Sequence, residues 1–162
     1  MIRPATQEDR EAVISIYNQA IAAKFLTAYT TQFSEKDGAA WFDQYMDHTH
    51  SMFVYLEENV VVGWLAITPY RSGREALRFT VEISYFVDAG HRGRGIGKQL
   101  IAHGLGACRQ LGYQRVLAII LEKNTASIHL LKHFGFEQWG YLPGVAVFDG
   151  LVCGHFYYGI PL

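Results

Sequence analysis

The stretch Val81–Gln99 reads V-E-I-S-Y-F-V-D-A-G-H-R-G-R-G-I-G-K-Q, and the rest of the chain is interpreted around it. An apolar run typical of a strand leads into a turn rich in glycine and arginine, and an amphipathic helix pattern follows directly. Glycine has no Cβ atom, so the backbone N–H groups of such a turn can approach a bulky anion closely. The first turn of the helix adds unsatisfied N–H groups and the positive end of the helix dipole. This order of features predicts a cradle for a phosphate or pyrophosphate group.

The composition indicates one globular domain over residues 1–162. Half of the 162 residues are hydrophobic, which is enough for a substantial core without disulfide or metal crosslinks. The formal net charge of −1 argues against a nucleic-acid-binding module, which usually carries a basic excess. The cationic side chains gather around the cradle instead, at His91, Arg92, Arg94 and Lys98. This pattern fits one small polyanion.

The sequence predicts a cytoplasmic protein without a membrane partner. Cys108 and Cys153 are far apart and form no C-x-x-C pair, so no disulfide framework is expected. The N-terminus lacks an apolar signal core, and no apolar run approaches the roughly 20 residues that cross a bilayer. His48 and His50 have no acidic or sulfur ligand at metal-binding spacing, and we expect no metal site.

The hydrophobic pattern predicts an α/β (α+β) fold with a mixed sheet. A strand at 2–4 and a helix to about residue 22 are followed by a connecting loop, a second helix from residue 34, and strands at 52–56, 60–67 and 77–87. These strands form an antiparallel meander. The strand at 77–87, the helix after the cradle and the apolar run 116–121 form a β-α-β unit with parallel strands. A further helix begins near Asn124, and a terminal hairpin follows.

Two helices carry specific burial expectations. In the second helix, Ala40, Trp41, Tyr45 and Met46 are expected on the buried face. In the helix after the cradle, a buried stripe is expected to run from Ile96 through Leu111.

Three glycine-rich designs compete for the cradle. A P-loop requires glycine where Arg92 stands and a hydroxyl where Gln99 stands. A dinucleotide-binding G-x-G-x-x-G that starts at Gly93 requires glycine at Lys98. The remaining design is R/Q-x-x-G-x-G/A between a strand and a helix, and Arg92–Gly97 matches it.

This last motif resembles the acetyl-coenzyme A motif of the GCN5-related N-acetyltransferase (GNAT) superfamily. A second signal, Asn124-x-x-Ser127 followed by Gly135-Phe136, stands at the spacing that the superfamily uses. The local runs around Thr80–Glu82, the cradle and Asn124–Ile128 are most similar to the phosphinothricin and methionine sulfoximine acetyltransferase branch. The resemblance implies the GNAT fold, in which a parallel strand pair surrounds the acetyl-CoA site and helices flank the sheet. It also implies a small amino acid or analogue as substrate, and a homodimer.

The resemblance implies roles for individual residues around acetyl-CoA. The backbone of the strand would pair with the pantetheine arm, the cradle N–H groups and arginines would hold the pyrophosphate, and Asn124 would contact the arm. The residues in these roles are Tyr85, Phe86, Val87, Arg92, Gly93, Arg94, Gly95, Ile96, Gly97, Lys98, Asn124 and Ser127.

Glu82 stands in the middle of the strand that enters the cradle. Strand alternation places Glu82, Ser84 and Phe86 on one face and Ile83, Tyr85 and Val87 on the other. A carboxylate among apolar residues is costly unless it is paired, and burial raises its pKa. Glu82 therefore either serves as a general base or pairs with an arginine such as Arg78. The glutamate that the resembled branch carries here favours the base.

The acceptor side is less defined by the sequence. Arg71 and Arg74 are candidates to bind a substrate carboxylate, and Tyr29 and Phe33 are candidates to line the pocket. The segment 23–33 is either a packed connecting loop or an aromatic wall of that pocket.

No general acid is assigned by the sequence. Many members of the superfamily place a tyrosine four positions before the Gly-Phe pair, where this chain has Leu131. His129 and His133 flank that position, and Tyr141 is a remote candidate. Two other functions stay open: transfer to a protein N-terminus, a polyamine or an antibiotic, and a non-catalytic acetyl-CoA-binding module.

Overall fold

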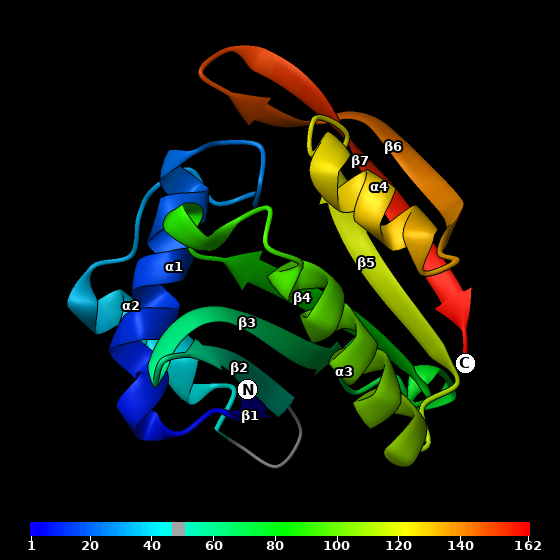
Figure 1. The fold of residues 1–162 in the computed structure, drawn as a ribbon. Coiled ribbons are helices and arrows are strands. Elements are labelled where there is room, and N and C mark those ends of the chain that lie inside the picture. The colour runs from blue at the N-terminus through cyan, green and yellow to red at the C-terminus, as the bar shows by residue number, and fades with distance from the viewer. Residues whose placement is uncertain (47–50) are drawn as a thin grey trace.

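A seven-stranded sheet forms the centre of the computed structural model, which describes residues 1–46 and 51–162 (Figure 1). The strand order is β1-β2-β3-β4-β5-β7-β6. Strands β4 and β5 run parallel, and the other neighbouring pairs run antiparallel. The expected α/β fold with a mixed, mostly antiparallel sheet is confirmed. His48 and His50 lie outside the described residues.

The element bounds follow the sequence pattern closely, with one exception. The expected third long strand does not begin at Leu77, because Glu75–Leu77 forms a short 3₁₀ helix (η2) and the strand begins at Thr80. The helices are α1 Arg10–Ala22, α2 Glu35–Asp43, α3 Ile96–Gln110 and α4 Thr125–His133, with 3₁₀ turns η1 Gln7–Asp9 and η3 Ala89–His91. The strands are β1 Ile2–Pro4, β2 Ser51–Glu57, β3 Val60–Pro69, β4 Thr80–Val87, β5 Arg115–Leu121, β6 Glu137–Phe148 and β7 Leu151–Pro161.

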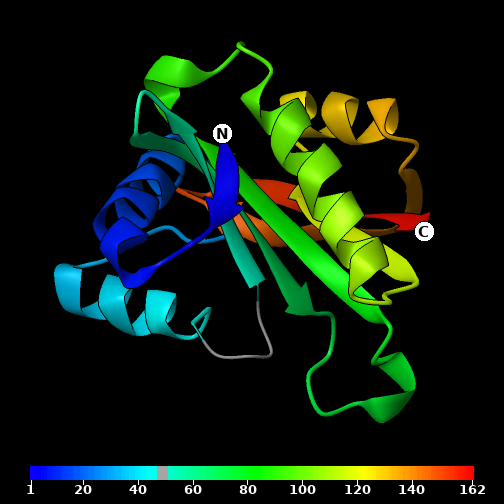
Figure 2. The ribbon, with the colours of Figure 1, turned by 60° about the horizontal axis from the view of Figure 1, so that its bottom comes forward.

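Helices cover both faces of the sheet (Figure 2). On one face, α1 and α2 pack over a cluster that includes Val13, Phe42 and Trp64. On the other face, α3 and α4 pack over a cluster that includes Leu100 and Leu131. Alternate residues of β4 belong to the two clusters, so this strand separates two chemically different sides of the molecule.

Two burial expectations for the helices are wrong. In α2 the buried residues are Gly38 and Phe42, while Ala40 is exposed. Ala40 lies two residues, or about 200°, from Phe42 around the helix, so the two cannot share a face. Leu111 is 56% exposed because it forms the C-cap of α3, beyond the last turn that packs on the sheet.

Strands β4 and β5 pair over only three residues each. Thr80, Val81 and Glu82 are opposite Arg115, Val116 and Leu117, after which the two strands diverge (Figure 1). The other edge of β4 stays paired with β3 as far as Val87. Among the described residues, no strand therefore pairs with the β5-facing edge of β4 from Ile83 to Val87. Apart from the Val87 carbonyl, which accepts a hydrogen bond from Arg92, backbone N–H and C=O groups on that edge are available to another partner.

Both cysteines are free thiols in the core, so the expected lack of a disulfide is confirmed. None of the helices in the described part of the chain is long and apolar enough to cross a bilayer. Within residues 1–46 and 51–162, His, Cys, Asp and Glu side chains do not gather in groups of three or more that could share a metal ion.

Candidate active site

A cavity of about 430 Å³ lies beside the free edge of β4. It is bounded by the end of β4, the cradle, the first turn of α3 and the first turns of α4. Its lining residues are Leu26, Tyr85, Phe86, Val87, His91, Arg92, Gly93, Gly95, Ile96, Gly97, Lys98, Asn124, Ala126, Ser127 and Leu130. The structure thus brings together every residue predicted for acetyl-CoA except Arg94. It adds Leu26, His91, Ala126 and Leu130, which the motifs did not indicate.

Backbone conformation favours glycine at Gly93 and Gly95, and close packing favours it at Gly97. Gly93 and Gly95 adopt φ of +77° and +79°, in the left-handed region that favours glycine. A Cβ atom added at either position would meet no protein atom within 4 Å, so both backbones face open space. At Gly97, a Cβ would stand 3.2 Å from Cδ2 of Leu130, so glycine there lets α4 approach the start of α3. The cradle is therefore an open backbone surface against which a bulky anion can lie.

Asn124 and Ser127 lie on the opposite wall of the cavity. The Asn124 side chain is the N-cap of α4, where its Oδ1 accepts a hydrogen bond of 3.2 Å from the Ser127 backbone N–H. Asn124 is only 9% exposed. The spacing Asn-x-x-Ser thus reflects a capped helix whose first turn points at the cavity.

Tyr85 lines the same cavity, and its hydroxyl is buried. Its oxygen forms no hydrogen bond with the described residues, although the neighbouring Ser127 side chain partly offsets the effect of burial on its pKa. Burial raises the pKa of Tyr85 to about 12, which keeps the phenol protonated. A buried donor without a partner is costly, so this hydroxyl lowers the stability of the free enzyme.

Glu82 lies on the opposite face of β4, toward α1 and α2. Burial raises the pKa of its carboxyl to about 7, and the Arg71 charge opposes that shift. The alternative pairing with Arg78 does not occur: Arg78 donates to the Glu75 carbonyl at 3.1 Å and stacks over the Phe79 ring. Within the described residues, Glu82 has no ion pair. A buried, unpaired carboxyl with a pKa near neutrality has the properties of a general base.

An aromatic cluster surrounds the side of β4 that carries Glu82. Tyr17 is at its centre, with ring centroids 5.8 Å from Tyr29, 5.7 Å from Phe33 and 4.8 Å from Phe86. The Glu82 charge is among the causes that raise the pKa of both Tyr17 and Tyr45, so the carboxylate faces this cluster. Tyr29 and Phe33 of the segment 23–33 thus pack against Tyr17 of α1.

The two candidate substrate arginines differ in position. Both are exposed residues of the loop between β3 and η2, but only the Arg71 charge acts on the Glu82 carboxyl. The sequence indicates no functional role for Tyr17. Its helical periodicity carries no sign of the ring contacts that it makes with the loop.

None of the acid candidates lies at the cavity. Leu131 is fully buried in the core, and His129 and His133 are on the exposed surface of α4. The Tyr141 hydroxyl donates to Glu122 at 2.7 Å, on the hairpin side of the sheet.

The fold and the site together define a class of protein. A sheet that opens between two parallel strands, a glycine cradle at the opening and a buried carboxyl on the adjoining strand are the features of an acyl-coenzyme A-dependent transferase. The model of the acetyltransferase (GNAT) family matches residues 18–136, and the chain belongs to this family. The expected enzyme class, an acetyl-CoA-dependent N-acetyltransferase, is confirmed.

Individual relatives agree with the predicted branch. YwnH of Bacillus subtilis (strain 168), provisionally named a phosphinothricin acetyltransferase, is 35% identical over 152 residues, which cover 92% of this chain and 91% of that protein. The L-methionine sulfoximine/L-methionine sulfone acetyltransferase of Salmonella typhimurium is 30% identical and covers 90% of this chain and 85% of its own. A phosphinothricin acetyltransferase from Sinorhizobium meliloti, solved in complex with AcCoA, superposes with a TM-score of 0.93 at 29% identity, covering 100% of this chain and 88% of that chain.

Proposed function

We propose that this enzyme transfers an acetyl group from acetyl-CoA to the α-amine of a small amino acid or analogue of the phosphinothricin, methionine sulfone or methionine sulfoximine type. The observation that carries the proposal is Glu82. It is a largely buried carboxyl without an ion pair among the described residues, at the point where β4 and β5 part and on the face of β4 that carries the aromatic cluster. The names of the relatives support the substrate class.

The residues around the cavity fit acetyl-CoA. The free edge of β4 at Tyr85–Val87 offers backbone groups to the pantetheine amides, and the open cradle offers N–H groups to the pyrophosphate. Arg92 and Lys98 supply positive charge at the cavity, and Asn124 with Ser127 closes its opposite wall. Bound acetyl-CoA supplies a thioester whose carbonyl carbon accepts the amine. A backbone N–H on β4 that polarises this carbonyl would contribute roughly 3–4 kcal/mol to catalysis.

Glu82 would take the proton of the substrate ammonium, directly or through a water molecule. Only a neutral amine attacks a thioester, and a carboxyl with a pKa of about 7 is largely ionised at slightly alkaline pH. The departing thiolate needs no dedicated acid, because a thiol pKa near about 8.5 makes it a tolerable leaving group.

The acceptor pocket would combine the aromatic cluster with one cation. Tyr29 and Phe33 would contact the side chain of the substrate, and Arg71 would bind its carboxylate. Arg74 stays a candidate from the same loop. The positive charge of these arginines would also disfavour the binding of polyamines and other polycationic amines.

A thiol-release assay across a panel of amines tests the substrate class. We expect turnover with phosphinothricin, methionine sulfone and methionine sulfoximine, and little with polyamines, aminoglycosides or peptide N-termini. Turnover confined to one of the latter groups would contradict the proposed substrate. Calorimetric binding of acetyl-CoA without transfer to any amine would favour a non-catalytic acetyl-CoA-binding module.

A homodimer and a cytoplasmic location belong to the same proposal. Exposed apolar side chains of β6 and β7 support the homodimer, among them Val145, Val147, Leu151 and Val152. Light scattering after size exclusion would give twice the 18.3 kDa of the chain for a dimer.

A further inference from the structure

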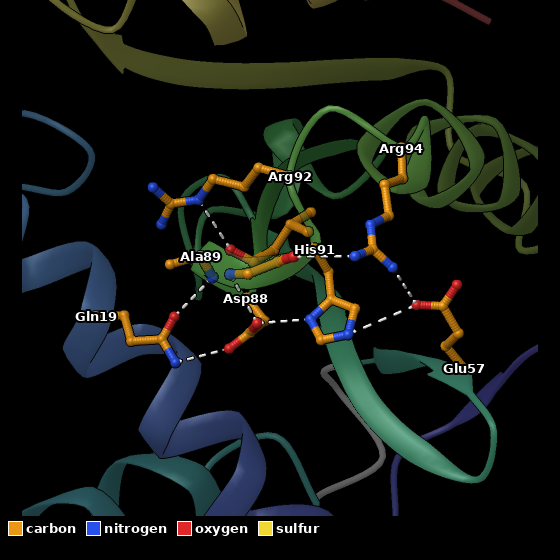
Figure 3. Close-up of polar contacts among 9 residues, drawn as sticks. Gln19, Glu57, Asp88, Ala89, His91, Arg92 and Arg94 are labelled. Carbon is orange, nitrogen blue, oxygen red and sulfur yellow. Dashed lines mark hydrogen bonds and ion pairs between the residues drawn. The ribbon is translucent and has the colours of Figure 1, made fainter.

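Glu57, the last residue of β2, places its carboxylate beside the cradle although no motif includes it (Figure 3). Its Oε2 atom lies 3.3 Å from a guanidinium nitrogen of Arg94 and 3.6 Å from Nε2 of His91. An arginine and a histidine of the cradle thus face one carboxylate that comes from a distant turn.

A hydrogen-bond network behind Glu57 fixes this arrangement. The Asp88 carboxylate contacts His91 Nδ1 at 2.6 Å and accepts from the Gly90 N–H at 3.0 Å and from Gln19 Nε2 at 2.8 Å. The Gln19 carbonyl oxygen in turn accepts from the Ala89 N–H at 2.8 Å. These contacts tie the loop that enters the cradle to α1 and orient the His91 ring so that Nε2 faces Glu57 (Figure 3).

Arg94 is held on the outer side of the cradle. Its guanidinium donates to Glu57 and, at 3.4 Å, to the Gly90 carbonyl, and it does not line the cavity. Arg92 differs, because it lines the cavity while its Nε donates to the Val87 carbonyl at 3.2 Å. Of the two arginines in the motif, only Arg92 is already at the cavity.

The Arg94–Glu57 pair is easily exchanged. The two side chains are 55% and 43% exposed, and exposed ion pairs of this kind contribute little to stability. A phosphate group carries more charge than a carboxylate and binds a guanidinium through two hydrogen bonds. A phosphate that reaches the cradle can therefore replace Glu57 as the partner of Arg94.

We propose that Glu57 is an internal competitor of the coenzyme phosphates, which holds Arg94 away from the cradle in the free enzyme and so limits coenzyme affinity. The inference rests on the proposed acetyl-CoA site and adds a residue that sets the strength of binding there. Binding would exchange the partner of Arg94 from carboxylate to phosphate, and release of the product would restore the ion pair.

A double-mutant cycle measured by calorimetry with acetyl-CoA tests this role. Because the competing pair is a weak exposed one, we expect Glu57→Gln to tighten binding roughly two- to fivefold. Glu58→Gln is the matched control, since Glu58 is the next residue of the same turn and its side chain forms no hydrogen bond or ion pair with the described residues. This variant should leave affinity unchanged. In an Arg94→Gln background, Glu57→Gln should bring no gain.

Each contrary outcome has a distinct meaning. Unchanged or weaker binding in Glu57→Gln, in a variant with the wild-type melting temperature, would overturn the competitor role. The same gain in the Arg94→Gln background, or in Glu58→Gln, would also overturn it by showing a general charge effect. A wild-type protein that does not bind acetyl-CoA would refute the coenzyme site itself, and the inference with it.

Discussion

Single residues of β4 carry different functions on its two faces. Glu82 points toward the aromatic cluster and Tyr85 lines the cavity, because side chains three positions apart along a strand point to opposite sides. Burying each of these polar groups costs folding free energy. The raised pKa of Glu82 and the unpartnered hydroxyl of Tyr85 are two forms of that cost. Strained or unsatisfied groups of this kind concentrate at functional sites.

Tyr85→Phe tests whether the buried hydroxyl lacks a partner in the free enzyme. Phenylalanine keeps the ring and removes an unsatisfied group whose burial costs about 1–3 kcal/mol. We expect the melting temperature of the free protein to rise, by about 2–4 °C for each kcal/mol gained. Differential scanning calorimetry measures this change. A lower melting temperature would show that the hydroxyl is already hydrogen-bonded, with Ser127 as the neighbouring polar side chain.

At the scale of elements, three glycines in helix α3 and at its N-cap stand in three different environments. Gly95 caps the helix at φ +79°, Gly104 packs against Leu65, and Gly106 has no neighbouring atom within 4 Å of a Cβ position. The same substitution should therefore have different effects at the three positions.

Alanine substitutions at these three positions test whether the environments differ in their effect on stability. We expect Gly95→Ala to destabilise the fold by about 1–2 kcal/mol, because an L-residue is strained in the left-handed region. Gly104→Ala should destabilise it as well, since the new Cβ would stand 2.9 Å from Leu65. Gly106→Ala should stabilise it by about 0.5–1 kcal/mol, as alanine does inside a helix. Urea unfolding measures all three, and a single common effect would contradict the account.

Local signals made the central elements predictable from the sequence. The spacing of Arg92, Gly95 and Gly97 between a strand and a helix indicated the cradle, and Asn124 with Ser127 marked a capped helix. The exposed Leu77 and Phe79 read as strand residues because their apolar character resembles a buried run, whereas they lie in and after a 3₁₀ turn. The local pattern of apolar residues permits a strand from Leu77, but in the folded chain this segment forms a 3₁₀ turn and the strand begins at Thr80.

Long-range contacts could not be predicted. Glu57 is 37 positions from Arg94, and Gln19 is 69 positions from Asp88, so no spacing rule joins them. The point at which β4 and β5 diverge is equally hidden in the sequence, because both segments continue as strands beyond it. These contacts depend on how the whole sheet twists and which loops then meet.

At the scale of the whole molecule, the burial of Glu82 should make the free energy of unfolding depend on pH. The folded pKa of about 7 lies above the usual value of 4.5, so the folded state binds this proton more tightly. Stability from this group is fully present below about pH 4.5 and declines as the pH rises through about 7. Glu82→Gln should remove that decline and stabilise the protein at pH 8 by on the order of 3 kcal/mol.

Thermal unfolding of wild type and Glu82→Gln between pH 4.5 and 8 measures this difference. Asp9→Asn, compared with wild type over a range extended down to about pH 3, is the control with the opposite sign, since the hydrogen bond from Arg3 lowers the pKa of Asp9. The Asp9 carboxylate stabilises the wild-type protein above about pH 4, and this contribution is lost as the pH falls below that value. A constant difference between wild type and Glu82→Gln across this range would contradict a buried, titrating Glu82.

The most direct test of Glu82 as the general base is the pH dependence of kcat/KM for acetyl transfer to methionine sulfoximine. We expect the wild-type profile to have an inflection near pH 7. In Glu82→Gln this inflection should be absent and the rate at neutral pH about 10²–10⁴-fold lower, with unchanged affinity for acetyl-CoA. A Glu82→Gln enzyme with the wild-type rate and the same inflection would contradict the assignment of Glu82 as the base.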